Sequence, residues 1–260
     1  MYDRLKSAGQ MGALAARIPV LALRPPYPWW RDAIAEIGTG VRRSIVPLML
    51  SDAVFLVSFV IIIFGNVLTN LGVTERESQA TVLFWAREIG TWVTSMIFAG
   101  IVGASITADL GSRRIREELD ALAVLGVDAK RELVVPRVVA TTLAMPALVF
   151  ISILGVNLLN WAVAPVLLGT FTRSLDVYMV SHSILPIDLL FPMLIKNTII
   201  GFGIGIVACH KGLTCKLGAE GVGRAVHQTV LISFFSIWMF NSFFNLAYLS
   251  VFPNAITIRG

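Results

Sequence analysis

One charged side chain lies inside a long apolar stretch of this 260-residue chain. Lys196 follows the run from Leu189 to Ile195 and precedes a glycine-rich apolar run. A lysine at the centre of a membrane is costly, so it usually faces a cavity or a partner and can bind the polar end of a ligand. The alternative is that its ammonium group extends outward to the membrane surface.

A second charged pair, Arg87 and Glu88, lies near the end of another apolar stretch, between Thr81–Ala86 and the run that starts at Ile89. Two interpretations are open. The two side chains form a local pair at the membrane interface, or they contribute with Lys196 to a pocket that binds an apolar substrate.

The short run Cys209-His210-Lys211-Gly212-Leu213-Thr214-Cys215 could suggest a metal site. A fourth ligand is missing, however, and the spacing matches no zinc template. The chain has no other cysteine, so a disulfide framework is excluded. We therefore predict reduced thiols in a basic turn and no metal.

Motifs for nucleotide binding and hydrolysis are missing from the sequence. There is no G-x-x-x-x-G-K-[ST], no H-E-x-x-H and no G-x-S-x-G, so we predict a chain that is not an enzyme and binds no cofactor. The glycine-rich run at 201–205 lies within an apolar stretch and indicates close helix packing instead. The helix-packing residues predicted from such small-residue spacing are Gly100, Gly103, Gly201 and Gly205.

The composition indicates an all-α membrane protein, because 56% of the residues are hydrophobic and only 14% are charged. Stretches long enough to span a membrane are 46–71, 85–109, 138–168, 186–209 and 229–252. The third is longer than required, and Pro146 and Pro165 are candidate break points.

Basic residues predict the orientation. Sixteen of the 21 Lys and Arg residues lie in 1–45, 110–137 and 210–224, which five crossings place on one side. The positive-inside rule makes that side cytoplasmic, so the N-terminus is expected inside and the C-terminus outside, in the plasma (inner) membrane. The net charge of +5 does not suggest nucleic acid, because no basic run with interleaved aromatic residues is present.

Residues 1–45 are predicted to form a cytoplasmic N-terminus and an interfacial helix. Trp30, Ile34, Ile37, Val41 and Ile45 recur at helical spacing, which suits a helix in the headgroup region. An ordinary cytoplasmic helix packed on the bundle is the alternative. The five-span domain then covers 46–252, and an extracytoplasmic tail covers 253–260.

Residues 111–127 are predicted to form a cytoplasmic helix between spans two and three. Ser112 is a plausible N-cap and Gly126 can end the helix. The helix is either a solvated connector or a coupling helix that docks a separate motor subunit. Its apolar stripe is Ile115, Leu119, Leu122 and Gly126, and its predicted i,i+4 ion pairs are Arg113 with Glu117, Arg114 with Glu118, and Arg116 with Asp120.

Several of these motifs resemble the MlaE/YrbE permeases, the membrane subunits of lipid-transporting ABC systems linked to MCE proteins. The resemblance covers about residues 27–250 and is most similar to the A-type YrbE subunit of actinobacterial Mce transporters. The motifs that carry it include Arg87-Glu88-Ile89-Gly90, Phe98-Ala99-Gly100, Ala108-Asp109-Leu110-Gly111, Ile115 to Leu122, Val135-Pro136-Arg137, Gly212-Leu213-Thr214 and Gly221 to Val226.

The resemblance implies an elbow helix, five spans and a coupling helix that inserts into a cytosolic ABC ATPase dimer, which binds ATP and Mg. It also implies a second YrbE-type permease subunit in a heterodimer, and MCE-domain substrate-binding proteins outside the membrane. Arg87, Glu88 and Lys196 would lie around the lipid pocket. The coupling residues would be Arg113, Arg116, Glu117, Glu118, Leu119, Asp120 and Leu122.

Two departures from the phospholipid-transporting branch make the expected pocket less polar. Ile101 stands where those permeases commonly have Arg, and Asn241 and Asn245 are the only polar amides where they carry Asp. The actinobacterial branch that the chain resembles is associated with fatty acids, mycolic acids or sterols, which suits a less charged pocket, and the resemblance implies such a cargo, moved inward. A membrane-embedded lipid-modifying enzyme and an ion-coupled lipid carrier are the alternatives.

Overall fold

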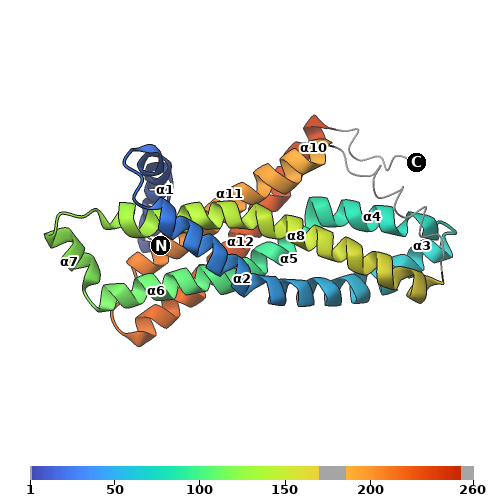
Figure 1. The fold of residues 1–260 in the computed structure, drawn as a ribbon, viewed down its shortest axis with the longest axis horizontal. Helices are drawn as coiled ribbons and strands as arrows, with labels where there is room; N and C mark the ends of the chain where they lie inside the picture. The colour runs from blue at the N-terminus through green and yellow to red at the C-terminus, as the bar shows by residue number, and fades with distance from the viewer. Residues whose placement is uncertain (1, 170–185, 253–260) are drawn as a thin grey trace. The chain divides into compact units, whose positions relative to one another are not determined.

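The structure is a computed structural model that describes residues 2–169 and 186–252. The tail predicted at 253–260 and the basic residues Arg173 and Arg259 lie outside the described residues. In the part that is described, helices joined by short connections form the whole architecture, without strands (Figure 1).

Five helices are long and apolar enough to cross a membrane, which confirms the predicted number of spans. In chain order, the described part places them at Trp30–Asn70, Glu77–Ile115, Lys130–Leu168, Leu189–Leu213 and Ala219–Val251. Each begins or ends several residues beyond the predicted stretch, because helices continue past the apolar segment into polar residues. The chain is therefore a multi-pass membrane protein.

Four of these helices contain π-helical segments, in which the backbone makes a wider turn than in an α-helix. The helical elements are α1 (Tyr2–Leu23); α2 (Trp30–Phe55), η1 (Leu56–Gly65) and α3 (Asn66–Asn70); the 3-10 turn η2 (Thr74–Arg76); α4 (Glu77–Phe84), η3 (Trp85–Ile89), α5 (Gly90–Phe98), η4 (Ala99–Gly103) and α6 (Ala104–Ile115); α7 (Glu118–Val124); η5 (Lys130–Val134) and α8 (Val135–Leu168); α10 (Pro186–Asp188), η6 (Leu189–Ile195) and α11 (Lys196–Leu213); and α12 (Ala219–Val251).

The residues group into two compact units. The first unit contains Met1–Ser44, Ser95–Met145 and Thr198–Ile237, and the second contains Ile45–Thr94, Pro146–Asn197 and Trp238–Gly260. All sixteen basic residues of the three predicted cytoplasmic regions belong to the first unit.

The predicted interfacial helix and span one, divided at residues 45 and 46, form one continuous helix. α2 runs without a break from Trp30 through Pro47. Its buried positions in the first unit are the small residues Ala33, Gly40 and Ser44, whereas Trp30 and Ile34 are exposed. This is the pattern of a membrane helix, which packs through small residues and leaves large apolar ones for lipid.

Span three also forms one continuous helix and does not break at either candidate proline. Pro146 and Pro165 both lie inside the single helix α8. Proline is tolerated in membrane helices when nearby groups satisfy the freed carbonyl groups, so the extra length of this segment continues as helix.

Thr107 joins three helices of the first unit. Its hydroxyl oxygen lies 2.9 Å from the hydroxyl oxygen of Thr229 and 3.1 Å from the carbonyl oxygen of Ala208. These contacts connect α6, α11 and α12 through fully buried groups. A buried hydroxyl needs such partners, so this polar contact fixes the helices in one register.

Candidate functional sites

An ion pair between two distant parts of the sequence is the centre of the polar cluster in the second unit. Arg87, on η3, donates from Nε to Oδ1 of Asp188 at 2.9 Å and from Nη2 to Oδ2 at 3.0 Å. This two-pronged geometry is the strongest form of an arginine–carboxylate contact. The side chain of Asp188 is fully buried and that of Arg87 is 18% exposed.

Tyr248, on α12, completes the surroundings of Asp188. Its hydroxyl donates to Oδ1 of Asp188 at 2.7 Å. A buried carboxylate is stable only when its oxygens are hydrogen-bonded and its charge is paired, and both conditions are met here. The result is a rigid polar centre formed by η3, α10 and α12.

Lys196 is fully buried, as expected for a charge that does not face lipid. Its ammonium group donates to the backbone carbonyl oxygen of Arg87 and lies 3.4 Å from Oδ1 of Asn245. It also lies 5.8 Å from the ring centre of Phe244, within the range of a cation–π contact. The side chain is therefore held by protein groups and does not extend outward to the membrane surface.

Glu88 and Arg87 face different partners, so the interpretation of a pair formed only with each other is wrong. Oε2 of Glu88 accepts a hydrogen bond from Nδ2 of Asn241 at 2.8 Å, whereas Arg87 binds Asp188. Successive residues on a helix point in different directions, which explains the separation.

A cavity of about 260 Å³ lies beside this cluster. Ala80, Leu83, Phe84 and Leu249 form its apolar walls, and its polar lining consists of Arg87, Glu88, Asn245 and Tyr248. Mostly apolar walls with a few convergent polar groups are typical of a site for an amphipathic small molecule. Lys196 is not part of this lining, but it contacts two of the lining residues, Arg87 and Asn245.

The sequence did not predict three residues of these buried polar clusters, which are Asp188, Tyr248 and Asp52. Asp52 lies inside span one, 1% exposed, and accepts a hydrogen bond from Ser152 at 2.6 Å. Ser152 in turn accepts one from Nε1 of Trp85 at 3.0 Å. An acidic residue within an apolar stretch was a usable signal for Asp52, whereas nothing in the local pattern marks Tyr248.

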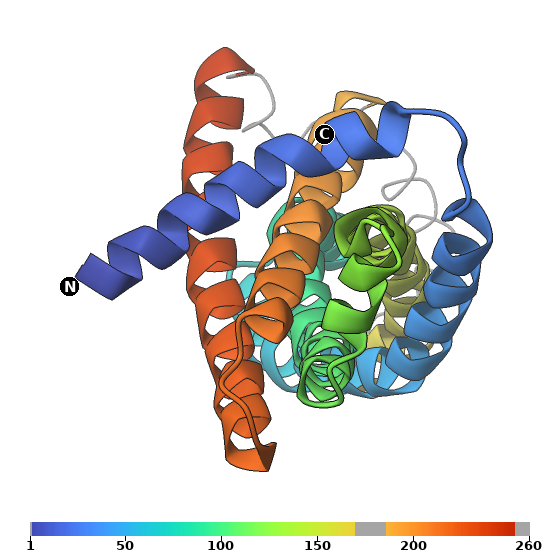
Figure 2. The same ribbon diagram turned by 90° about the vertical axis from the view of Figure 1, so that its left-hand side faces the viewer.

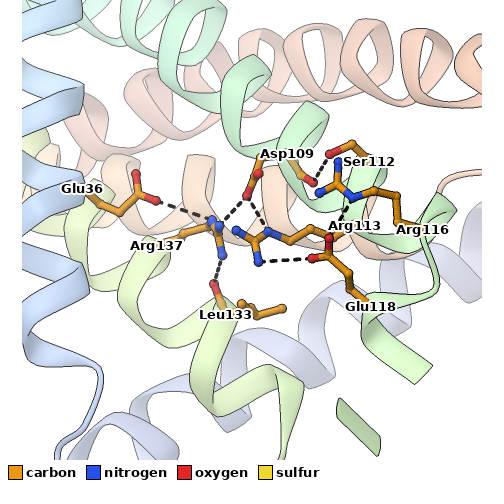
Figure 3. Close-up of polar contacts among 8 residues, drawn as sticks. All are labelled: Glu36, Asp109, Ser112, Arg113, Arg116, Glu118, Leu133 and Arg137. Carbon is orange, nitrogen blue, oxygen red and sulfur yellow. Dashed lines mark hydrogen bonds and ion pairs between the residues drawn. The ribbon is translucent and has the colours of Figure 1, made fainter. Parts of the chain in front are cut away.

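A second polar network lies in the first unit, where the predicted coupling segment meets α2 and α8 (Figure 3). Arg137 lies between two acidic residues, with an ion pair to Asp109 and one of 3.8 Å to Glu36. It also donates to the carbonyl oxygen of Leu133 at 2.6 Å. Asp109 and Arg137 come from two of the motifs that carry the family resemblance, and the fold brings them together.

The predicted continuous helix over residues 111–127 is wrong. α6 ends at Ile115, and α7 begins at Glu118 after Glu117 adopts a left-handed backbone conformation, with φ of 59°. Ser112 lies inside α6, where its hydroxyl donates to the carbonyl oxygen of Asp109 at 2.8 Å, so it is not an N-cap.

The break changes the ion pairs. Arg113 binds Asp109 at 3.2 Å and Glu118 at 3.4 Å, and Arg116 binds Glu118 at 2.7 Å (Figure 3). The predicted i,i+4 pairs required one helix through Glu117. Instead, Glu118 forms ion pairs with both Arg113 and Arg116, and these pairs hold the start of α7 against the end of α6.

Gly126 ends α7 as predicted. Its φ of +72° is left-handed, the amide of Val127 donates to the carbonyl oxygen of Leu122 at 2.9 Å, and that of Gly126 donates to Ala123 at 3.1 Å. This pair of bonds is a Schellman motif. α7 is thus a short helix with a defined start and a defined end.

The exposed apolar surface near α7 differs from the predicted stripe. Leu119 and Leu122 are half-buried, whereas Val124 is 87% and Leu125 is 75% exposed. Of the three predicted acidic coupling residues, Glu117 and Asp120 are exposed and Glu118 is half-buried. The surface available to a partner is therefore the C-terminal end of α7.

Three of the four predicted packing glycines lie against a neighbouring helix. A Cβ added at Gly201 would lie 2.7 Å from Cβ of Met145, one at Gly205 would lie 3.2 Å from Cα of Val138, and one at Gly103 would lie 3.3 Å from Ile204. Gly100 faces open space within the described part of the chain, so the structure does not support a packing role for it.

The cysteine-containing run is mostly helix and not a turn. Cys209 and His210 lie in the last part of α11, and Cys215 follows it. Both cysteines are buried and free, and Ser7 of α1 lies 3.2 Å from Nε2 of His210. The described residues contain no cluster of His, Cys, Asp and Glu that could hold a metal ion.

The part of the chain that the structure describes thus combines five membrane-spanning helices, a buried ion pair and a short, exposed helix between two spans. Residues 34–247 match the MlaE permease family, and the chain belongs to that family.

Named relatives agree with this assignment. A probable ABC transporter permease protein of Rickettsia prowazekii is 38% identical over 62% of this chain and 62% of its own length. One from Synechocystis is 32% identical over 66% of this chain and 65% of its own. The chloroplastic protein TRIGALACTOSYLDIACYLGLYCEROL 1 of Arabidopsis thaliana is 29% identical over 81% of this chain and 59% of its own. The chain thus spans about three fifths of the length of the relatives it matches.

Proposed function

We propose that this chain is the permease subunit of an ATP-driven transporter that moves hydrophobic lipids across a cell-envelope membrane. The observation that carries the proposal is α7, a short exposed helix between two spans within a chain of the MlaE permease family. A membrane subunit that has no nucleotide-binding motif of its own needs such a surface to receive a motor.

The docking surface consists of Val124 and Leu125, supported by the ion pairs of Glu118. Two exposed apolar residues on a helix held at both ends can enter a groove of a partner. Arg137 and Asp109 connect the α6 side of this segment to α8, so movement of α7 would reach span three through fixed contacts. The partner in this proposal is a cytosolic ABC ATPase dimer that supplies ATP and Mg.

The cargo in this proposal enters the cavity beside Arg87. Its walls are mostly apolar, and Arg87, the one cation among its described lining residues, already binds Asp188, so little positive charge is available for a phosphate headgroup. A fatty acid, mycolic acid or sterol, with one polar end and a large apolar body, suits this lining better than a phospholipid. Import is the expected direction.

The orientation and remaining partners follow from the same proposal. The sixteen basic residues of the first unit would lie on the cytoplasmic side of the plasma membrane. A second YrbE-type subunit would complete the permease, with this chain as the A-type member. MCE-domain proteins would deliver cargo from outside.

Co-purification followed by an ATPase assay tests the proposal. We expect an ATPase to be retained by the tagged chain, and its hydrolysis rate to change when lipid is added to the complex. Lipid transport by the chain alone in proteoliposomes, without any nucleotide-binding partner, would show that the proposal is wrong.

A further inference from the structure

A basic cavity in the first unit is separate from both sites described above. It has a volume of about 370 Å³ and lies between α1, the end of α11 and the start of α12. Four cationic side chains line it, and none of its described lining residues is acidic. The cations are Lys6, Lys211, Lys216 and Arg224.

The charges in this cavity are incompletely compensated. Arg224 has an ion pair of 3.5 Å with Glu220, whose side chain is 83% exposed and therefore contributes little. Lys211 donates to the neutral amide oxygen of Gln228 at 3.1 Å. Several cations gathered in one concave site raise the local concentration of anions.

An apolar groove of about 550 Å³ adjoins the basic cavity. The two share Ser7, Lys211 and Gln228, so they are continuous. The other walls of the groove are Ala8, Met11, Leu231 and Ile232. Figure 2 shows α1 passing across α11 and α12, and residues of these three helices line the groove.

We propose that this composite site binds an anionic phospholipid. The phosphate of its headgroup lies in the basic cavity, and an acyl chain occupies the groove along α1 and α12. Lys211, the charged residue common to both parts, lies where the phosphate meets the glycerol. Lys211 is in the last turn of a membrane-spanning helix, the depth at which lipid headgroups lie.

The groove is the reason to assign a lipid and not a soluble phosphate compound. A free phosphate or a nucleotide would use the four cations but would leave the apolar walls at Met11 and Leu231 uncovered. One side of the site, from Lys6 to Met11, belongs to α1, which lies before the region matched by the permease family, residues 34–247. It does not depend on the transport role proposed above.

Lipid retention by the purified complex tests the assignment. Native mass spectrometry after addition of equal phosphatidylglycerol and phosphatidylcholine should show preferential retention of phosphatidylglycerol. The double variant Lys211→Gln/Arg224→Gln should lower that retention about tenfold, because each cation near an anionic lipid contributes to binding. Lys130→Gln, which removes an exposed cation outside the site, is the matched control and should leave retention unchanged.

Two further measurements separate the possible ligands. Leu231→Gln should also lower retention if an acyl chain occupies the groove, and millimolar inorganic phosphate or glycerol phosphate should not displace the lipid. Displacement by these anions, with no effect of Leu231→Gln, would assign the cavity to a soluble phosphate compound and overturn the proposal. Full retention by the double variant would also overturn it. The charge-retaining pair Lys211→Arg/Arg224→Lys should bind normally and controls for folding.

Discussion

Arg87 and Asp188 are separated by 101 residues, yet two hydrogen bonds of 2.9 and 3.0 Å join them inside the second unit. The pair brings η3 to α10 and, through Tyr248, to α12. Contacts between three parts of the chain therefore determine the shape of the polar side of the cavity beside Arg87.

Removing one member of this pair should destabilise the protein strongly. Arg87→Met leaves the buried carboxylate of Asp188 without its cation, and we expect a loss of about 3–5 kcal/mol in the free energy of unfolding. The double variant Arg87→Met/Asp188→Leu should lose less, because no charge remains unpaired. Thermal unfolding in detergent, arranged as a double-mutant cycle, measures the difference. Equal losses in the single and double variants would contradict this account.

Replacing Lys196 should affect the cavity through Arg87. Lys196→Met keeps most of the volume but removes the donor to the Arg87 carbonyl group, at a cost of about 1–3 kcal/mol. We expect assembled complex with reduced lipid uptake, measured by size-exclusion chromatography and a transport assay on the same preparation. Normal uptake would show that Lys196 has only a structural role.

A charge at the exposed end of α7 should release the ATPase. Leu125→Asp places a carboxylate on the proposed apolar docking surface, and we expect loss of the co-purifying ATPase while the permease stays folded. Leu217→Asp is a matched control, because Leu217 is 72% exposed against 75% for Leu125 and lies in another connection of the first unit. Retention of the ATPase by the Leu125 variant would reject the docking surface.

The two left-handed residues that bracket α7 should respond in opposite ways. Glu117→Gly should stabilise the start of the helix or leave it unchanged, because a non-glycine residue in this conformation costs roughly 1–2 kcal/mol. Gly126→Ala introduces the same cost at the other end and should destabilise it. Hydrogen exchange of the α7 amides reports both changes, and identical effects would argue against the Schellman end of α7.

The glycines of α11 provide a paired test of helix packing. Gly201→Ala forces a methyl group against Met145 and the Thr141 carbonyl group, so we expect a loss of about 1–3 kcal/mol. Gly203→Ala, two residues away, meets nothing within 4 Å and should be tolerated. The melting temperatures of the two variants in detergent measure this difference in stability. Equal melting temperatures would contradict the packing assignment.

Much of the architecture could be predicted because the strongest forces leave a local pattern. The five spans follow from apolar length, and Arg87 and Lys196 stand out because charge is rare in such stretches. Asp188 could not be found this way. It lies at the start of a span, where an acidic residue is common, and its partner is distant in the sequence.

The break between α6 and α7 could not be predicted from the sequence for a different reason. The helical period continues through Glu117, and glutamate is a good helix former, so nothing local marks a left-handed residue there. The break brings Glu118 within reach of both Arg113 and Arg116, at spacings of five and two residues that differ from the i,i+4 spacing of a continuous helix. These short-range ion pairs accompany a backbone conformation that local preference opposes.

The π-helical segment η3 controls the rotational setting of the residues that follow it. A π turn contains one residue more than an α turn, which is equivalent to about 100° of rotation around the helix axis. Trp92 follows η3 and lies with its ring centre 4.6 Å from that of Trp238. If η3 tightened to α geometry, Trp92 would swing away from Trp238, and Glu88 would leave Asn241. The wide turn η3 therefore sets which side chains between it and η4 face α12.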